Sequence, residues 1–82
     1  VNRVVPAAEL EAQVKALAQR LAGGPTRALG EMRRLMRSAF DRSLPQQLDA
    51  EAAAFERCAR TEDFRAGVEA FFAKQPAQFT GQ

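Results

Sequence analysis

The stretch Pro25–Arg42 reads PTRALGEMRRLMRSAFDR and decides the fold class of this chain. Its apolar residues recur three and four positions apart, which is the period of an α-helix with one apolar face. These residues are Ala28, Leu29, Met32, Leu35, Met36, Ala39 and Phe40. Proline favours the first position of a helix. We therefore expect a helix over 25–42 that packs its apolar face against the rest of the protein.

The charged residues of this stretch all fall outside the apolar arc. They give the predicted helix a net charge of +3, whereas the whole chain carries only +2: Arg27, Arg33, Arg34, Arg37 and Arg42 against Glu31 and Asp41. Such an arc could follow a nucleic-acid backbone, but no exposed aromatic is interleaved for base stacking. We favour a solvated face or a subunit contact, and we expect no nucleic-acid partner.

The same helical period continues on both sides of this stretch. A first helix is expected over 7–22, where Gly23 and Gly24 end it, and its apolar stripe is Leu10, Val14, Leu17, Ala18 and Leu21. Pro45 marks a third helix over 45–60, whose buried face should carry Leu48, Ala52, Phe55 and Ala59. Thr61 can cap a fourth helix over 61–74, with Glu62 and Asp63 in its first turn.

These helices predict an all-α fold, a small bundle of three to four amphipathic helices. Residues 1–6 should be the end of a truncated strand or a linker, because they are rich in β-branched valine and stop at a proline. Residues 75–82 should be an irregular tail with one apolar anchor at Phe79. The whole chain, 1–82, is then one small domain.

The composition leaves little room for chemistry within these 82 residues. Histidine is absent, so the commonest general base and the commonest metal ligand are missing. Cys58 is the only thiol, and Ser38 and Ser43 lack a base to activate them. No apolar run is long enough to cross a membrane. We expect no catalytic residue, no metal site and no membrane contact.

Phe71 and Lys74 stand out near the end of the fourth helix. Three positions apart, they should share a helix face, where an aromatic ring could hold a flat base while an ammonium meets a phosphate. From spacing alone a structural interpretation is favoured, with Phe71 in the core and Lys74 complementing the negative end of the helix dipole.

Several ordered landmarks resemble the C-terminal region of the enoyl-CoA hydratase/isomerase (crotonase) superfamily. The resemblance covers nearly the whole chain, and its last segment is the most specific. Its residues are Val1 to Pro6, Gly24-Pro25-Thr26, Thr61 to Arg65 with Gly67, and Ala70 to Gly81. The fold is then the C-terminal helical domain of a crotonase-like protein. Because the chain begins at Val1 rather than methionine, we expect it to be part of a longer protein.

The resemblance implies an enzyme whose catalytic domain, with its oxyanion hole and acidic residues, is absent from these residues. Members act on acyl-coenzyme A as substrate, hold no permanently bound cofactor, and usually assemble as homotrimers or hexamers. In some members this domain reaches the coenzyme A of a neighbouring subunit, with a phenylalanine by the adenine and a lysine by the 3′-phosphate. The matching positions are Phe71 and Lys74. Gln75 stands where many relatives carry arginine, which implies a less charged anion site.

Two hypotheses follow. In the first, the chain is the oligomerisation and coenzyme A-contacting domain of a cytoplasmic enoyl-CoA hydratase or isomerase, and its partners are its own catalytic domain and neighbouring subunits. In the second, it is a stand-alone helical protein-interaction module without catalysis. Either way, the separated domain should expose apolar helix faces and self-associate or be loosely packed.

Overall fold

The computed structural model describes all 82 residues and contains four α-helices and no strand. The helices are α1 (Ala7–Ala22), α2 (Thr26–Ser38), α3 (Leu44–Ala59) and α4 (Glu62–Ala73), and a 3₁₀ turn, η1 (Ala39–Asp41), follows α2. The predicted all-α fold class is confirmed. None of these helices combines the length and the apolar composition that crossing a membrane requires.

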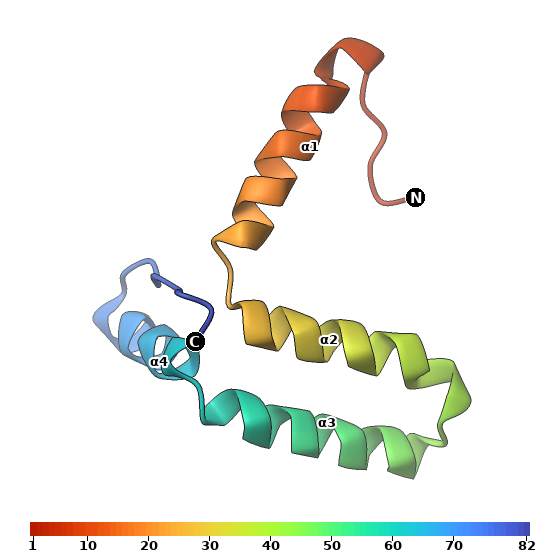
Figure 1. Cartoon of the computed structure of the whole chain (residues 1–82), viewed down its shortest axis with the longest axis vertical. Coiled ribbons are helices and arrows are strands. Elements are labelled where there is room, and N and C mark those ends of the chain that lie inside the picture. Colours follow the sequence, from red (N-terminus) through yellow and green to blue (C-terminus); the bar gives the residue numbers. More distant parts are fainter.

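Three of the helices form the body of the molecule, and the fourth stands apart (Figure 1). α2 and α3 run antiparallel as a hairpin closed by η1, and α4 packs near the end of α3. α1 extends away from this body, connected to it by Gly23 and Gly24. The molecule is correspondingly open, with extents of 45 × 37 × 20 Å.

The boundaries of α2, α3 and α4 each differ from the predicted ranges by one residue, except that α2 ends four residues early. Local hydrogen bonds explain the end of α2 and the start of α3. α2 ends at Ser38 instead of continuing to 42, and the Ser38 hydroxyl donates to the Arg34 carbonyl at 3.3 Å where the chain tightens into η1. α3 begins at Leu44, because Ser43 and Gln46 form a capping box. The Ser43 amide donates to Gln46 Oε1 at 2.9 Å, and the Gln46 amide donates to Ser43 Oγ at 3.4 Å.

The apolar core is far smaller than the sequence pattern predicts. Ala54 is the only buried apolar residue, while Leu48 and Phe55 of the face expected to be buried are 56% and 65% exposed. The expected buried face of α3 is therefore wrong for these 82 residues alone. Small side chains such as Ala54 let helices approach closely, but α2 and α4 cover only part of α3. Its larger apolar side chains are left without cover.

The N-terminal segment forms no strand. Residues 1–6 have no regular secondary structure, because a strand needs a partner strand and the chain provides none. Instead Arg3 Nη1 donates to Gln13 Oε1 at 3.0 Å, which ties this segment to α1. Within these 82 residues the segment is thus an irregular linker, and its pairing as the end of a strand stays a prediction.

Candidate functional site

The two candidate site residues lie where α4 ends, but they do not share a helix face. α4 stops at Ala73, and Lys74 adopts a left-handed conformation with φ 53° and ψ 43°. The same-face argument requires both residues to be helical, so it fails here. Their one hydrogen bond is in the backbone, where the Lys74 amide donates to the Phe71 carbonyl at 3.2 Å.

Backbone hydrogen bonds fix this left-handed position. Besides the Lys74 bond, the Gln75 amide donates to the Ala70 carbonyl at 3.0 Å, which completes a Schellman motif. The left-handed position of that motif usually holds glycine, because any other L-residue costs about 1 kcal/mol there. Lys74 is the only non-glycine residue of the chain with a positive φ. Such an outlier is a reason to look for a function of its side chain.

Both side chains are available to a ligand. Phe71 is 78% exposed, so its placement in the core is wrong for these residues alone. Its ring meets Phe72 edge to face, with centroids 5.7 Å apart. Lys74 is also exposed, and it takes part in none of the chain's three salt bridges. An aromatic ring and an unpaired ammonium thus lie at one exposed helix end.

Asp63 ties the C-terminal tail back to the start of α4. Its carboxylate accepts the Thr80 amide at 2.7 Å and the Gly81 amide at 2.9 Å, and its own amide donates to the Gln82 carbonyl at 3.0 Å. Asp63 is 3% exposed. The segment 75–82 therefore returns along α4, and its last residues are anchored at the start of that helix. The prediction of an irregular tail missed this anchor.

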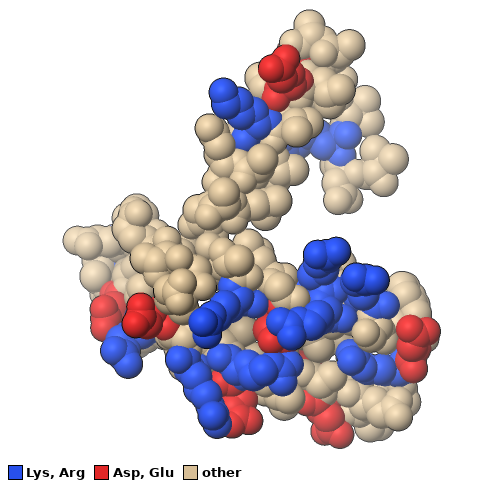
Figure 2. Space-filling model, viewed as in Figure 1, with Lys and Arg blue, Asp and Glu red and all other residues tan.

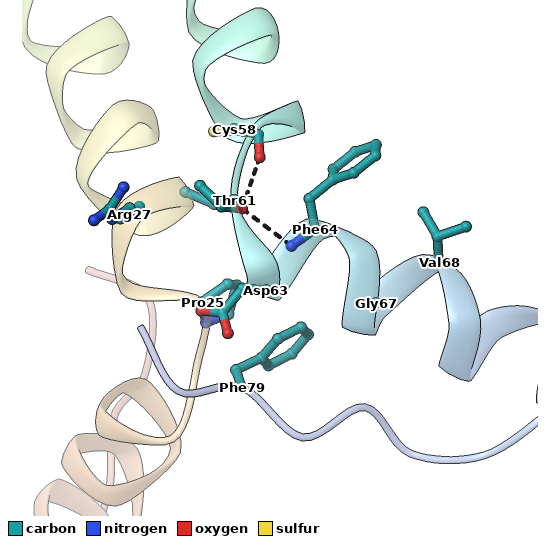
Figure 3. A pocket seen from close by; sticks show the side chains of 10 residues that line it. Pro25, Arg27, Cys58, Thr61, Asp63, Phe64, Gly67, Val68 and Phe79 are labelled. Atoms are coloured by element: carbon teal, nitrogen blue, oxygen red, sulfur yellow. Dashed lines mark hydrogen bonds between the residues drawn. The ribbon is translucent and has the colours of Figure 1, made fainter. Parts of the chain in front are cut away.

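A pocket beside this anchor shows how the tail is seated (Figure 3). The Thr61 hydroxyl donates to the Cys58 carbonyl at 2.7 Å and accepts the Phe64 amide at 3.0 Å, which confirms Thr61 as the cap of α4. Phe79 lies so close to Gly67 that a Cβ added there would be 3.6 Å from its ring. The apolar anchor expected at Phe79 is thus found, and Phe79 and Asp63 together close the loop that begins at Lys74.

A second buried charge joins α2 to α3. Glu31 is only 7% exposed and accepts two hydrogen bonds from Arg57, at 3.0 Å from Nε and 2.8 Å from Nη2. Arg34 Nη2 lies 3.2 Å from the same carboxylate. The hydrogen bond from Arg57 and the positive charges of Arg34 and Arg57 lower the pKa of Glu31 below its ordinary 4.5, against the opposing effect of burial.

Sequence reasoning missed both buried carboxylates for the same reason. A helical wheel places Glu31 outside the apolar arc, and Asp63 is explained by the first turn of α4 alone. Neither argument sees the partner, Arg57 in one case and the tail in the other. No group of three or more histidine, cysteine or acidic side chains is placed to hold a metal ion.

Comparison with known protein families shows which family the chain resembles. The sequence model of the family described as enoyl-CoA hydratase/isomerase matches residues 1–82. A Rhodobacter capsulatus protein named probable enoyl-CoA hydratase is 36% identical over 78 residues, which is 95% of this chain and 30% of that protein. The 1,2-epoxyphenylacetyl-CoA isomerase of Escherichia coli is 42% identical over 66 residues, 80% of this chain and 25% of that enzyme.

Solved structures with the same fold as this chain carry the same family description. A Mycobacterium abscessus protein named as an enoyl-CoA hydratase/isomerase superposes on the whole chain with a TM-score of 0.94 at 38% identity. Subunit I of a Geobacillus kaustophilus enoyl-CoA hydratase superposes with a TM-score of 0.93 at 33% identity. In both cases the chain covers 32% of the other protein. The chain thus spans about a third or less of the relatives it matches.

Proposed function

Because the chain belongs to the enoyl-CoA hydratase/isomerase family, we propose that it forms the C-terminal helical domain of a cytoplasmic enzyme. That enzyme hydrates enoyl-coenzyme A thioesters or moves their double bonds. Its substrate is an acyl-coenzyme A, and it holds no permanently bound cofactor. Within it, this domain packs against its own catalytic domain and against neighbouring subunits, and it contributes Phe71 and Lys74 to coenzyme A.

The observation that carries the coenzyme A role is the left-handed conformation of Lys74. A lysine occupies the one cap position where glycine would be favoured, and its ammonium has no partner in the chain. An ammonium of this kind is a compact point charge that suits a phosphate. Beside it, the exposed ring of Phe71 offers a flat apolar surface on which an adenine can stack.

The packing role is supported by the apolar residues that the chain leaves uncovered. They lie on α1, α2, η1 and α3 and include Leu10, Val14, Met36, Phe40, Leu48 and Phe55. Large apolar side chains left exposed along several helices are typical of surfaces that contact other proteins. We propose that the catalytic domain and neighbouring subunits cover these side chains, in a homotrimer or a hexamer.

Gln75 tunes the coenzyme A site instead of adding charge to it. It follows Lys74 directly, and its amide makes the bond to Ala70 that completes the helix cap. A glutamine side chain can donate a neutral hydrogen bond to a phosphate, which is weaker than the charged bond of an arginine. Lys74 is then the main charge that this domain brings to the 3′-phosphate.

Replacing Lys74 with glycine tests this proposal in the full-length gene product. Lys74→Gly removes the ammonium and relieves the left-handed strain, so folding should be unimpaired. The affinity for coenzyme A, measured by calorimetry, should fall about tenfold, because one charge-assisted hydrogen bond is lost. The matched control is Arg65→Ala, which removes an exposed positive charge from α4, the helix that Lys74 caps. An unchanged affinity in Lys74→Gly, or an equal loss in the control, would remove Lys74 from the site.

The alternative is a stand-alone helical interaction module without catalysis. The same uncovered apolar faces favour it, since a binding module also needs an exposed apolar surface. The two hypotheses differ in what the gene encodes before Val1. A glycine-rich oxyanion loop upstream supports the enzyme, and a start codon directly before Val1 supports the module.

A further inference from the structure

A hollow between α2 and α3 is lined by four arginines, two from α2, one from α3 and one from the residue directly after α3. They are Arg27, Arg34, Arg57 and Arg60. The remaining lining residues include Thr26, Gly30 and a single carboxylate, Glu31. In the space-filling view the positive side chains gather over α2 and α3 (Figure 2). The proposed packing of apolar faces does not use this surface, nor does the site at Lys74.

The arginines are only partly neutralised within the chain. Glu31 forms salt bridges with Arg34 and Arg57, and Glu56 forms one with Arg60. Arg27 forms no salt bridge. The hollow therefore has four guanidinium groups and only two carboxylates to balance their charge, Glu31 in its lining and Glu56 paired with Arg60. Each guanidinium has five N–H donors, so several donors of every group remain free for a ligand.

Glu31 also holds part of this surface in place. Its two oxygens take Nε and Nη2 of Arg57, which leaves the Nη1 group of Arg57 free. A guanidinium fixed in this way loses less side-chain freedom when it binds an anion. Arg57 and Arg34 remain 56% and 70% exposed at their side chains, so an anion from solution can reach them.

We propose that this hollow is a binding site for a small, multiply charged phosphate anion, with a diphosphate group as the best-matched ligand. Arginine forks match phosphate oxygens in geometry as well as in charge. No aromatic residue lines the hollow, so a nucleobase would find no stacking surface there. The guanidinium groups also surround one hollow instead of following a line, which suits a compact anion better than a nucleic-acid backbone.

The hollow is separate from the proposed coenzyme A contact. Its last lining residue, Arg60, comes just before the start of α4, whereas Lys74 lies just beyond the end of that helix. The 12 residues of α4 separate the two places by about 18 Å along the helix axis. The 3′-phosphate and the diphosphate of coenzyme A hang from one ribose, so they are too close together to occupy both. The inference therefore does not rest on the proposed function.

Calorimetric titration of inorganic pyrophosphate into the full-length gene product tests the site. We expect saturable binding to one site per chain that weakens as salt is raised. The double variant Arg27→Ala/Arg60→Ala should bind about tenfold more weakly or worse, because two charged donors are lost. Both residues are exposed, so the variant should fold. The matched control is Arg33→Ala/Arg37→Ala, which removes the same charge from α2 outside the hollow and should change the affinity less than about twofold.

Three results would overturn the proposal. One is the absence of saturable binding, and another is an equal loss in both double variants, which would indicate charge attraction without a site. The third is tighter binding of duplex DNA with losses shared by all four arginines of these variants, which would indicate an extended nucleic-acid surface. Lys74→Gly should leave pyrophosphate binding unchanged. A loss in that variant would place the anion at the end of α4 and exclude the hollow, whatever the outcome for coenzyme A.

Discussion

The two ends of the chain differ in how they are attached to the rest of the molecule. The C-terminal segment 75–82 has no regular secondary structure, yet Asp63 holds it by hydrogen bonds and Phe79 packs over Gly67. α1 is a regular helix of 16 residues, yet it makes few contacts with the other helices, and its apolar stripe is exposed. Regular structure and tertiary support are therefore independent properties in this molecule.

This difference indicates where each end finds its stability. The tail binds two of its backbone amides, those of Thr80 and Gly81, to one buried carboxylate within the 82 residues. α1 satisfies its backbone internally but leaves its apolar side chains in water, and isolated helices of this length are marginal. We infer that α1 needs a surface that these residues do not provide. The following predictions test whether the tail is stable within these 82 residues while α1 depends on a surface outside them.

The largest effect is expected at α1. Leu17→Asp should destabilise the full-length gene product by about 3 kcal/mol or more, because a charge replaces an apolar side chain at a covered position. In the 82-residue chain by itself, the same change should cost only the difference in helix propensity, about 0.5 kcal/mol. Chemical denaturation of both forms measures the two values.

The control for this prediction lies on the same helix. Gln19→Asp introduces the same charge at another exposed position of α1, outside the apolar stripe, and should have a small effect in both forms. If Leu17→Asp were equally mild in both forms, α1 would have no covering surface. The contrast between the two ends would then be lost.

A smaller effect is expected when the tail is released. Asp63→Ala removes the acceptor of two backbone amides, which should lower the local free energy of unfolding by about 2 kcal/mol. Hydrogen exchange at the Thr80 and Gly81 amides should then quicken about 30-fold. Glu62→Ala, the neighbouring exposed carboxylate, is the control and should leave both amides protected. Unchanged exchange in Asp63→Ala would mean that Phe79 and the bond from the Asp63 amide to the Gln82 carbonyl hold the tail without the carboxylate.

The Glu31–Arg57 contact should make the hairpin of α2 and α3 sensitive to acid. The folded protein lowers the pKa of Glu31, so the contact contributes stability above the ordinary value of 4.5 and loses it as pH falls through the lower folded value. Thermal unfolding should therefore show a drop in stability below about pH 4.5 that is reduced in Glu31→Gln. An identical acid profile in the variant would assign the drop to other carboxylates.

The smallest effect is expected at Gly67, under the tail. A Cβ there would lie 3.6 Å from the Phe79 ring, an ordinary contact, and alanine favours a helix by up to about 1 kcal/mol over glycine. Gly67→Ala should thus be neutral or slightly stabilising in a thermal melt. Gly81→Ala is the matched contrast, because φ is 83° there and a Cβ would lie 3.2 Å from Thr26 Oγ1. It should destabilise, and a clear loss in Gly67→Ala as well would show that the tail tolerates no added bulk.

Helix periodicity was enough to predict the fold class and to place the four helices. Pro25, Pro45 and Thr61 lie at or next to the first residues of α2, α3 and α4, where a proline or a capping hydroxyl acts locally. The pairing of Ser43 with Gln46 is also local and could have been read from its spacing. Local signals thus account for most of the fold.

What the sequence could not predict depends on distant partners. Arg57 is 26 positions from Glu31, and Gly81 is 18 positions from Asp63, so no local pattern reveals either contact. The exposed Phe71 and Leu48 look like core residues because periodicity identifies an apolar face without showing what covers it. The left-handed Lys74 was not predicted either, since lysine rarely takes that conformation.

The most direct test of the central proposal, that Lys74 reaches the 3′-phosphate of coenzyme A, is a cycle of two ligands and two proteins. Coenzyme A and dephospho-coenzyme A, which lacks only the 3′-phosphate, are titrated into the wild-type full-length gene product and into Lys74→Gly. The variant should lose about tenfold in affinity for coenzyme A and almost nothing for dephospho-coenzyme A. An equal loss for both ligands, or no loss for either, would contradict the assignment of Lys74 to that phosphate.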